Sequence, residues 1–66
     1  MRNLGGRVRE CREKLEWTQE DLAERSGLDR SYIAGIEAGL RNPSAKALAK
    51  IARGLGLTLS GLVQNL

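Results

Sequence analysis

The chain has 66 residues, 41% of them hydrophobic and 29% charged, and a formal net charge of +3 at pH 7. This is the composition of an ordinary globular domain, and no run approaches the roughly 20 apolar residues of a membrane span, so a disordered or membrane-embedded chain is excluded. The lack of histidine and the single cysteine, Cys11, exclude a disulfide framework, a zinc site and a nucleophile–histidine pair within one chain.

The first predicted helix covers residues 3–15, where apolar side chains recur at helical spacing. Cys11 lies on that apolar stripe and is expected to be a small buried hydrophobe. Gly5 and Gly6 each cost roughly 1 kcal/mol relative to alanine inside a helix, which predicts either fraying of the first turn or a close approach of the backbone to another segment. After the helix, no glycine C-cap is present, so an irregular turn is predicted at 16–17.

The second predicted helix covers residues 19–26 and begins after Thr18, a favourable N-cap residue. Asp21 follows three residues later and gives a weak version of the capping box. Gly27 ends this helix, and residues 27–29 then form the short glycine-containing connection that is typical of a helix-turn-helix. A plain helical hairpin is the alternative interpretation.

The third predicted helix lies within residues 27–39, and Asp29 is its predicted N-cap. Its two faces have different characters. The inner face carries Ile33 and Ile36, with Glu37 and Leu40 continuing that side. The other face has one long cation followed by small residues, at spacings of three, four and seven: Arg30, Ser31, Ala34, Gly35 and Ala38. A face of this shape suits insertion into a groove.

Two further helices complete the prediction of an all-α fold of five helices. Pro43 prevents the third helix from continuing, and Ser44 caps the fourth. The fourth helix is expected to bury Leu48, Ile51, Ala52 and Leu55. The last helix is expected to run from Thr58 to the end of the chain, and its large aliphatic residues exceed what a terminal helix needs to cover its own domain: Leu59, Leu62, Val63 and Leu66.

Charge is unevenly distributed along the chain. Residues 1–29 carry six basic and seven acidic residues, whereas residues 30–66 carry five basic residues and one acid, Glu37. The basic excess begins with the third helix and favours a polyanionic partner. The alternative is an ordinary solvated basic surface, and the same alternative applies to the stripe of Lys46, Lys50 and Arg53 on the fourth helix.

Residues 17–44, W-T-Q-E-D-L-A-E-R-S-G-L-D-R-S-Y-I-A-G-I-E-A-G-L-R-N-P-S, resemble the phage repressor and Cro family of helix-turn-helix regulators, the Xre type. Within them, L-D-R-S-Y-I-A-G-I-E with R-N downstream is most similar to the controller proteins of restriction–modification systems. The resemblance implies that residues 1–66 form a single five-helix, lambda-repressor-like domain. It also implies that the third helix lies in the major groove and that two copies bind a palindrome.

The resemblance also implies roles for individual residues. Base reading is assigned to Arg30, Ser31, Ala34 and Gly35. Contacts with the DNA backbone are assigned to Gln19, Arg41 and Asn42. Apart from the resemblance, we also expect Tyr32, Ser44 and Lys46 to contact the DNA backbone. A structural ion pair is assigned to Glu37 and Arg12, which agrees with the high cost of an unpaired internal carboxylate.

The chemistry of the residues agrees with these roles but leaves alternatives at several positions. Arg30 can hold guanine O6 and N7 in a bidentate fork. Ala34 and Gly35 cannot hydrogen-bond a base edge. Either Ala34 contacts a thymine methyl, or both residues only permit another segment to approach closely. At Gly35, that segment is either DNA or the second helix. Tyr32 either packs beside Ile36 or reaches DNA with its hydroxyl. Trp17 is expected to have a structural role.

These observations predict a cytoplasmic, homodimeric transcriptional regulator that binds double-stranded DNA and uses no cofactor, metal or small-molecule ligand. Its dimer interface is expected to include Leu59, Leu62, Val63 and Leu66. An antitoxin or adaptor that uses the same fold to bind another protein is the alternative. An enzyme is not expected, because the chain offers no histidine, metal cluster or phosphate-binding glycine loop.

Overall fold

The computed structural model describes residues 3–64 and 66. They form five α-helices and no strand, which confirms the all-α prediction: α1 (Leu4–Lys14), α2 (Gln19–Ser26), α3 (Arg30–Glu37), α4 (Ala45–Gly54) and α5 (Leu59–Leu62). Within this described part of the chain, no helix has the length and apolar character needed to cross a membrane.

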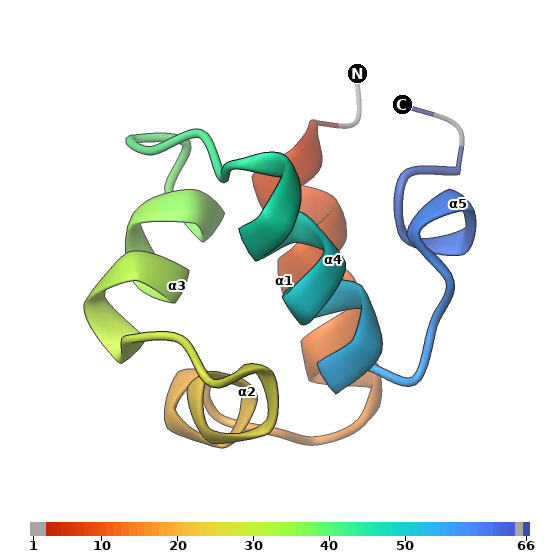
Figure 1. The fold of residues 1–66 in the computed structure, drawn as a ribbon. Helices are drawn as coiled ribbons and strands as arrows, with labels where there is room; N and C mark the ends of the chain where they lie inside the picture. Colours follow the sequence, from red (N-terminus) through yellow and green to blue (C-terminus); the bar gives the residue numbers. More distant parts are fainter. Residues whose placement is uncertain (1–2, 65) are drawn as a thin grey trace.

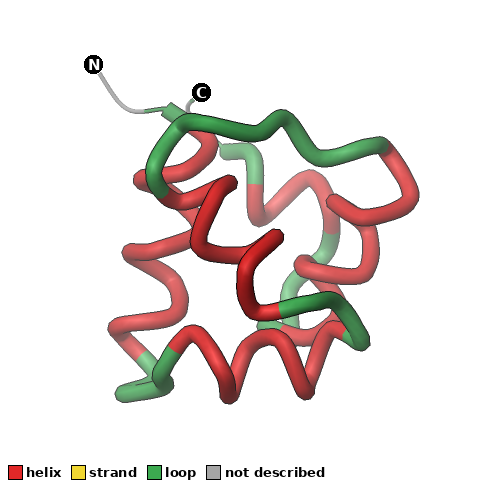
Figure 2. The backbone as a smooth tube through the Cα atoms, turned by 90° about the vertical axis from the view of Figure 1, so that its left-hand side faces the viewer, coloured by secondary structure: helices red, strands yellow, loops and turns green. Residues whose placement is uncertain are grey.

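In the view of Figure 1, α4 lies in front of α1, with α3 on one side of them and α5 on the other. Helix α2 packs against α3 and α4, while α1 contacts both α3 and α5. Helices α3 and α5 lie on opposite sides, and the view in which α3 faces the reader places α5 behind the other elements (Figure 2). One side of the molecule therefore presents α3, and the other presents α5.

The core takes buried side chains from all five helices and from the turn after α4. Its completely covered members are Val8, Leu22, Ile33, Ile51 and Leu62. Cys11 is buried as predicted. Two details of the predicted helices differ. Ala47 is buried at the start of α4, whereas Leu48 is only half-buried against the core. Leu15, the last residue of the predicted range 3–15, is exposed and lies beyond the end of α1.

Side-chain caps explain where most helices begin. Thr18 and Asp21 form a complete capping box, in which the Asp21 amide donates to Thr18 Oγ1 at 3.1 Å and the Thr18 amide donates to Asp21 Oδ2 at 2.8 Å. Hydrogen bonding of the Asp21 carboxylate, first with the backbone amide of Thr18 and then with its side chain, lowers the pKa of Asp21. Ser44 caps α4 as predicted. Asp29 occupies the N-cap position of α3, but the predicted side-chain cap is wrong, because its carboxylate makes no capping hydrogen bond.

The turn between α1 and α2 is irregular, as predicted. Glu16 adopts a positive φ of 60°, which is uncommon for a residue with a side chain. The amide of Trp17 donates to the carbonyl of Arg12 at 3.2 Å, so the chain closes α1 without glycine.

Helix α5 is shorter than predicted, because it ends at Leu62 instead of reaching the end of the chain. Arg7, on α1, explains this end: its Nε donates to the carbonyl of Leu62 and its Nη2 to the carbonyl of Gly61, both at 2.9 Å. These two carbonyls are among those that lose helical partners at a C-terminus. The guanidinium therefore satisfies the end of α5 and fastens it to α1.

Gly5 marks a close approach of two backbones, one of the two alternatives that the sequence left open. A Cβ added at Gly5 would collide with the carbonyl oxygen of Ile36 and lie 2.9 Å from that of Glu37. Gly6, one residue later, would bring its Cβ near only the side chain of Asn3. Gly5 thus permits α1 to pass directly against the end of α3, which holds α3 at its position on the molecular surface.

Candidate nucleic-acid interface

Helix α3 has the two faces that its sequence predicted. Ile33 and Ile36 are buried in the core, whereas Arg30 and Ser31 are exposed at the start of the opposite face. Gly27 precedes the helix in the left-handed conformation, with φ of 73°, and its amide donates to the carbonyl of Ala23. The sharp turn between α2 and α3 confirms the predicted helix-turn-helix connection and presents the outer face of α3 to solvent.

An ion pair fixes α3 to α1. Arg12 Nε lies 2.8 Å from Glu37 Oε2, and Arg12 Nη2 donates to Glu37 Oε1 at 3.0 Å. The exposed fractions of the two side chains are 11% and 3%, so the pair is largely removed from water. The bond to Glu37 raises the pKa of Arg12. The predicted pair is therefore present, with the bidentate geometry that makes arginine–carboxylate contacts strong.

The ion pair extends to the surface through Gln19. Gln19 Nε2 donates to Glu37 Oε1 at 3.1 Å, and Arg30 Nη1 approaches Gln19 Oε1 at 3.5 Å. The second contact is at the long limit for a hydrogen bond, so Arg30 stays exposed and weakly held. Gln19 and Arg30 also line a shallow hollow with two neighbours from the start of α2, Thr18 and Glu20. The predicted backbone-contacting and base-reading residues are thus adjacent.

The other edge of α3 carries Tyr32, which contacts the loop before α4. Arg41 Cζ lies 4.9 Å from the centre of the Tyr32 ring, and the Ser44 amide donates to the Tyr32 hydroxyl at 3.3 Å. Arg41 also covers Gly35, where an added Cβ would lie 2.9 Å from Arg41 Cγ and Cδ. Within the protein, the segment that approaches Gly35 is therefore this loop and not the second helix.

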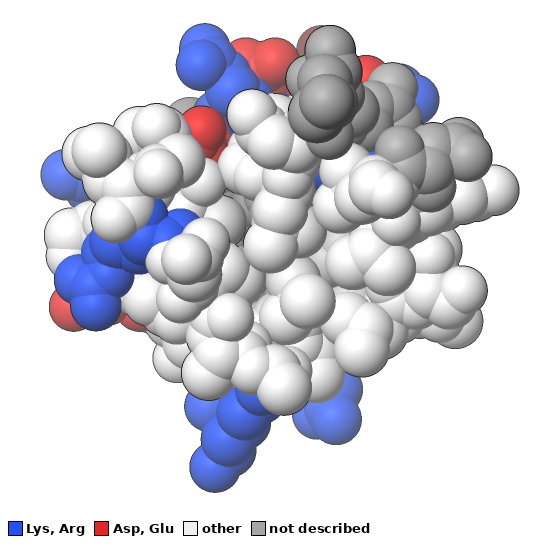
Figure 3. All heavy atoms as spheres, turned by 90° about the horizontal axis from the view of Figure 1, so that it is seen from above, with Lys and Arg blue, Asp and Glu red and all other residues white. Residues whose placement is uncertain are grey.

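Basic residues of α4 continue the surface beside Tyr32. Lys46, which was predicted to contact the backbone, lines a shallow groove. The other residues of the groove are Leu28, Tyr32, Ser44, Ala47 and Lys50. Lys50 was assigned no DNA contact and was placed only in the basic stripe of the fourth helix. Its position one helical turn after Lys46 indicates that both lysines lie on the groove beside Tyr32. Asn42 is exposed on the loop between α3 and α4. Seen from above, basic side chains lie at the margins of a largely uncharged centre (Figure 3).

The predicted dimer residues divide into two groups. Leu59 and Leu66 are exposed, and Val63 is half-buried. Leu62 is completely buried in the core of its own chain, so its assignment to an exposed interface is wrong. The periodicity of the last residues placed Leu62 correctly on an apolar face, but that face covers the core. Leu59 is the first residue of α5, which lies on the side of the molecule opposite α3 (Figure 1).

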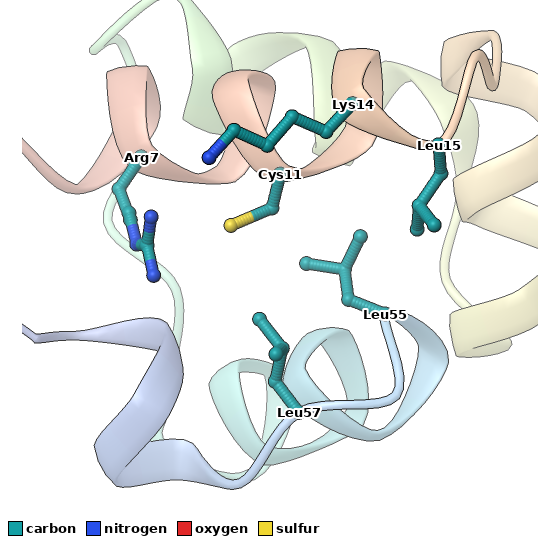
Figure 4. Close-up of a pocket in the computed structure, with 6 residues that line it drawn as sticks. All are labelled: Arg7, Cys11, Lys14, Leu15, Leu55 and Leu57. Atoms are coloured by element: carbon teal, nitrogen blue, oxygen red, sulfur yellow. The ribbon is translucent and has the colours of Figure 1, made fainter.

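An apolar groove lies next to α5, between α1 and the end of α4. Cys11, Leu15, Leu55 and Leu57 face one another across it, with Arg7 and Lys14 at its edge (Figure 4). Trp17 lies in the turn after α1, and Arg25 Cζ stacks 4.8 Å from the centre of its ring. This contact supports the structural role expected for Trp17. Among the described residues, no group of three potential metal ligands is present.

A model of the helix-turn-helix family matches residues 8–62 of the chain. The chain is 43% identical over 64 residues to the control protein C.MunI of Mycoplasma sp, and the match covers 96% of this chain and 86% of that protein. It is 40% identical over 60 residues to the immunity repressor protein of Bacillus phage phi105, covering 91% of this chain and 42% of that protein. The chain thus spans less than half the length of the phage relative.

Solved structures place the chain among the same kinds of regulators as the sequence relatives do. The restriction-modification controller protein C.AhdI from Aeromonas hydrophila has a TM-score of 0.86 and 44% identity, over 89% of this chain and 89% of that chain. The master regulator for biofilm formation SinR, in a crystal structure with DNA, has a TM-score of 0.86 and 30% identity, over 94% of this chain and 100% of that chain. These similarities confirm the predicted repressor-like fold and the resemblance to controller proteins.

Proposed function

This chain belongs to the helix-turn-helix family of transcriptional regulators, and from that premise we propose that it binds a palindromic operator in double-stranded DNA as a homodimer. The observation that carries the proposal is the outer face of α3. It is exposed at Arg30 and Ser31, small in profile at the half-buried Ala34 and Gly35, and bordered by cations from α3 itself and from the following loop. Such a face fits the major groove, where side chains can reach base edges.

The proposed contacts divide into positioning and reading. Lys46 and the amide end of α4 contribute to backbone binding, since Lys46 and Ser44 line one groove with Tyr32 of α3. Asn42 contributes from its exposed position on the loop between α3 and α4. Arg30 reads a base edge, because its guanidinium is exposed at the first turn of α3. The amide nitrogen of Gln19 is bound to Glu37, and its amide oxygen lies 3.5 Å from Arg30 Nη1, so Gln19 lies beside the proposed reading residue.

Relatives support the same assignment. The phage relative is named as a repressor, the Mycoplasma relative as a control protein, and a structural neighbour was solved bound to DNA. These relatives are regulators and not enzymes. In the proposed mechanism, control comes from protein concentration, because dimerisation and binding to two half-sites are coupled equilibria.

Selection from a random duplex library is expected to enrich a sequence with two symmetric half-sites. Affinity for that duplex should fall steeply with added salt, because each neutralised phosphate contributes a slope of about −0.9 to the logarithmic salt dependence. A fluorescence titration across a salt series measures both affinity and slope. Binding that is absent, or that shows no sequence preference, would contradict the proposed function and favour the protein-interaction alternative.

Leu59→Asp is expected to convert the dimer into monomers with little loss of fold. Leu59 is 44% exposed on α5, so a carboxylate is tolerated in the free chain but is costly inside an apolar interface. Sedimentation velocity over a concentration series measures the change. Leu40→Asp is the matched control, since Leu40 is 81% exposed on the loop after α3. A Leu59→Asp variant that dimerises as well as the control would place the interface elsewhere.

A further inference from the structure

Helix α1 contacts two other helices with opposite faces. Gly5 and Arg12 are seven residues apart and therefore share one face, while Arg7 lies roughly 140–160° around the helix axis from both. The first face lies against the end of α3, where Gly5 leaves room for two backbone carbonyls and Arg12 pairs with Glu37. The opposite face carries the Arg7 guanidinium to the end of α5. Helix α1 therefore joins α3 to α5, which lie on opposite sides of it (Figure 1).

The joint between α1 and α3 is rigid. Arg12 and Glu37 form a buried, bidentate ion pair, and at Gly5 the two backbones approach each other without an intervening side chain. Helix α4 follows a different path, because it contacts α2 and α5. The orientation of α3, the proposed reading helix, is thus transmitted to α5 most directly through α1.

The joint between α1 and α5 depends on Arg7. Helix α5 has four residues, too few to be a stable helix by itself, and Leu62 is the buried one among them. Arg7 adds a second anchor, because two nitrogens of its planar guanidinium donate to the carbonyls of Gly61 and Leu62, each at 2.9 Å. Its third nitrogen, Nη1, donates to Glu10 Oε1 of α1 at 3.0 Å. A buried leucine alone leaves the direction of α5 free, whereas the leucine and this two-carbonyl clamp together fix it.

We propose that Arg7 is a positioning residue that fixes the spacing of the two DNA half-sites. The inference rests on the proposed function, in which Leu59 of α5 meets its counterpart across a twofold axis. The two copies of α3 are then joined through α1 and α5 of each subunit. A fixed angle between α1 and α5 therefore gives a fixed separation of the two reading helices.

A change of spacing by one base pair is a large change for a rigid dimer. It moves the second half-site by about 3.4 Å along the DNA and turns it by about 35° around the DNA axis. A dimer with α5 held firmly on α1 loses contacts at one half-site when this happens. A dimer with a loosened α5 adapts to the new spacing.

Operators that differ only in half-site spacing test the inference. The half-sites come from selection with wild type, and their separation is the selected one or is one or two base pairs longer or shorter. Coupling between two sites typically changes affinity by about 5- to 150-fold, so wild type should prefer its best spacing by about that factor. Arg7→Ala should reduce the preference to below about 5-fold. Fluorescence titration at fixed salt measures each affinity.

Two further variants separate the clamp from charge and from a general effect on α1. Arg7→Lys keeps the positive charge and most of the aliphatic segment, but its ammonium does not hold two carbonyls in one plane. Its spacing preference should therefore also be reduced. Arg9→Ala is the matched control, since it removes the same residue type from α1 at a position that is 61% exposed. It should keep the wild-type preference.

The spacing preference is a ratio of affinities, so it separates positioning from stability. A variant that only folds less well or dimerises less tightly binds every spacing more weakly and keeps the ratio. A duplex with a single half-site gives a second measurement. In the Leu59→Asp background, adding Arg7→Ala should not change the affinity for that duplex, because the contacts of α3 with α1 are intact.

An unchanged spacing ratio in both Arg7 variants would contradict the inference, since Arg7 would then support only folding or dimerisation. Wild type that reads two half-sites but has no preferred spacing would also overturn it, while leaving the DNA-binding function in place. If wild type selects no sequence with two half-sites, the proposed function fails, and this inference fails with it.

Discussion

Glu37→Ala is expected to lower the free energy of unfolding by about 3–5 kcal/mol, because it leaves the Arg12 guanidinium buried without its carboxylate. The same change removes the acceptor of the Gln19 amide. Folded proteins have roughly 0.05–0.15 kcal/mol of stability per residue, so this loss is a large share of what a 66-residue chain has available. Urea denaturation followed by circular dichroism measures the difference.

An exposed ion pair on α1, the helix that carries Arg12, provides the matched control for Glu37→Ala. Arg9 Nε lies 3.2 Å from Glu13 Oε2, but the side chains are 61% and 55% exposed. Glu13→Ala should therefore cost only about 0.3–0.5 kcal/mol. Replacing both buried partners, as Arg12→Met with Glu37→Leu, should recover much of the loss, since no charge is then stranded. Equal stability of Glu37→Ala and Glu13→Ala would show that burial adds nothing to the Arg12–Glu37 pair.

Glu37→Ala should weaken DNA binding by more than the loss of folded protein alone explains. Glu37 holds Gln19, and Gln19 contacts Arg30, so the buried pair is connected to the proposed reading residue. Binding measured at a temperature where Glu37→Ala remains folded should still be weaker than wild type. The ion pair thus joins the stability of the fold to the orientation of the interface.

Local signals in the sequence were sufficient for the first four helices. The N-cap residues Thr18 and Ser44 mark where two of these helices begin, and apolar periodicity marks each helix. Both signals act over a few residues and are visible in the sequence. The outer face of α3 could be predicted for the same reason. Asp29 shows the limit of such signals, because a residue type suited to capping does not fix the rotamer that makes the cap.

Contacts between distant residues explain what was missed. Helix α5 ends where Arg7 binds the carbonyls of Gly61 and Leu62, more than 50 positions along the chain, and no local pattern reveals that contact. Leu62 was assigned to a dimer surface because its apolar character does not say whether a core or a partner covers it. The position of Arg41 over Gly35 depends in the same way on the path of the loop between α3 and α4, which no local pattern reveals.

Gly5→Ala is expected to destabilise the fold by about 1–3 kcal/mol, in spite of the roughly 1 kcal/mol that alanine contributes to a helix. The added Cβ would collide with the carbonyl oxygen of Ile36, and backbone atoms cannot move aside as a flexible side chain does. Relief requires that α1 move away from the end of α3, which also separates Arg12 from Glu37. Thermal and urea unfolding of the variant measure the cost.

Gly6→Ala is the control, because it adds the same methyl group one residue later. Its Cβ would lie 3.1 Å from Asn3 Oδ1, the end of an exposed side chain that can shift. The helix-propensity gain should then be nearly complete, so Gly6→Ala should be neutral or more stable by up to about 1 kcal/mol. If both variants gained stability, α1 would not be pressed against α3 at Gly5. If Gly5→Ala lowers the free energy of unfolding and Gly6→Ala raises it, the contact of α1 with the end of α3, and not glycine flexibility, requires a glycine at position 5.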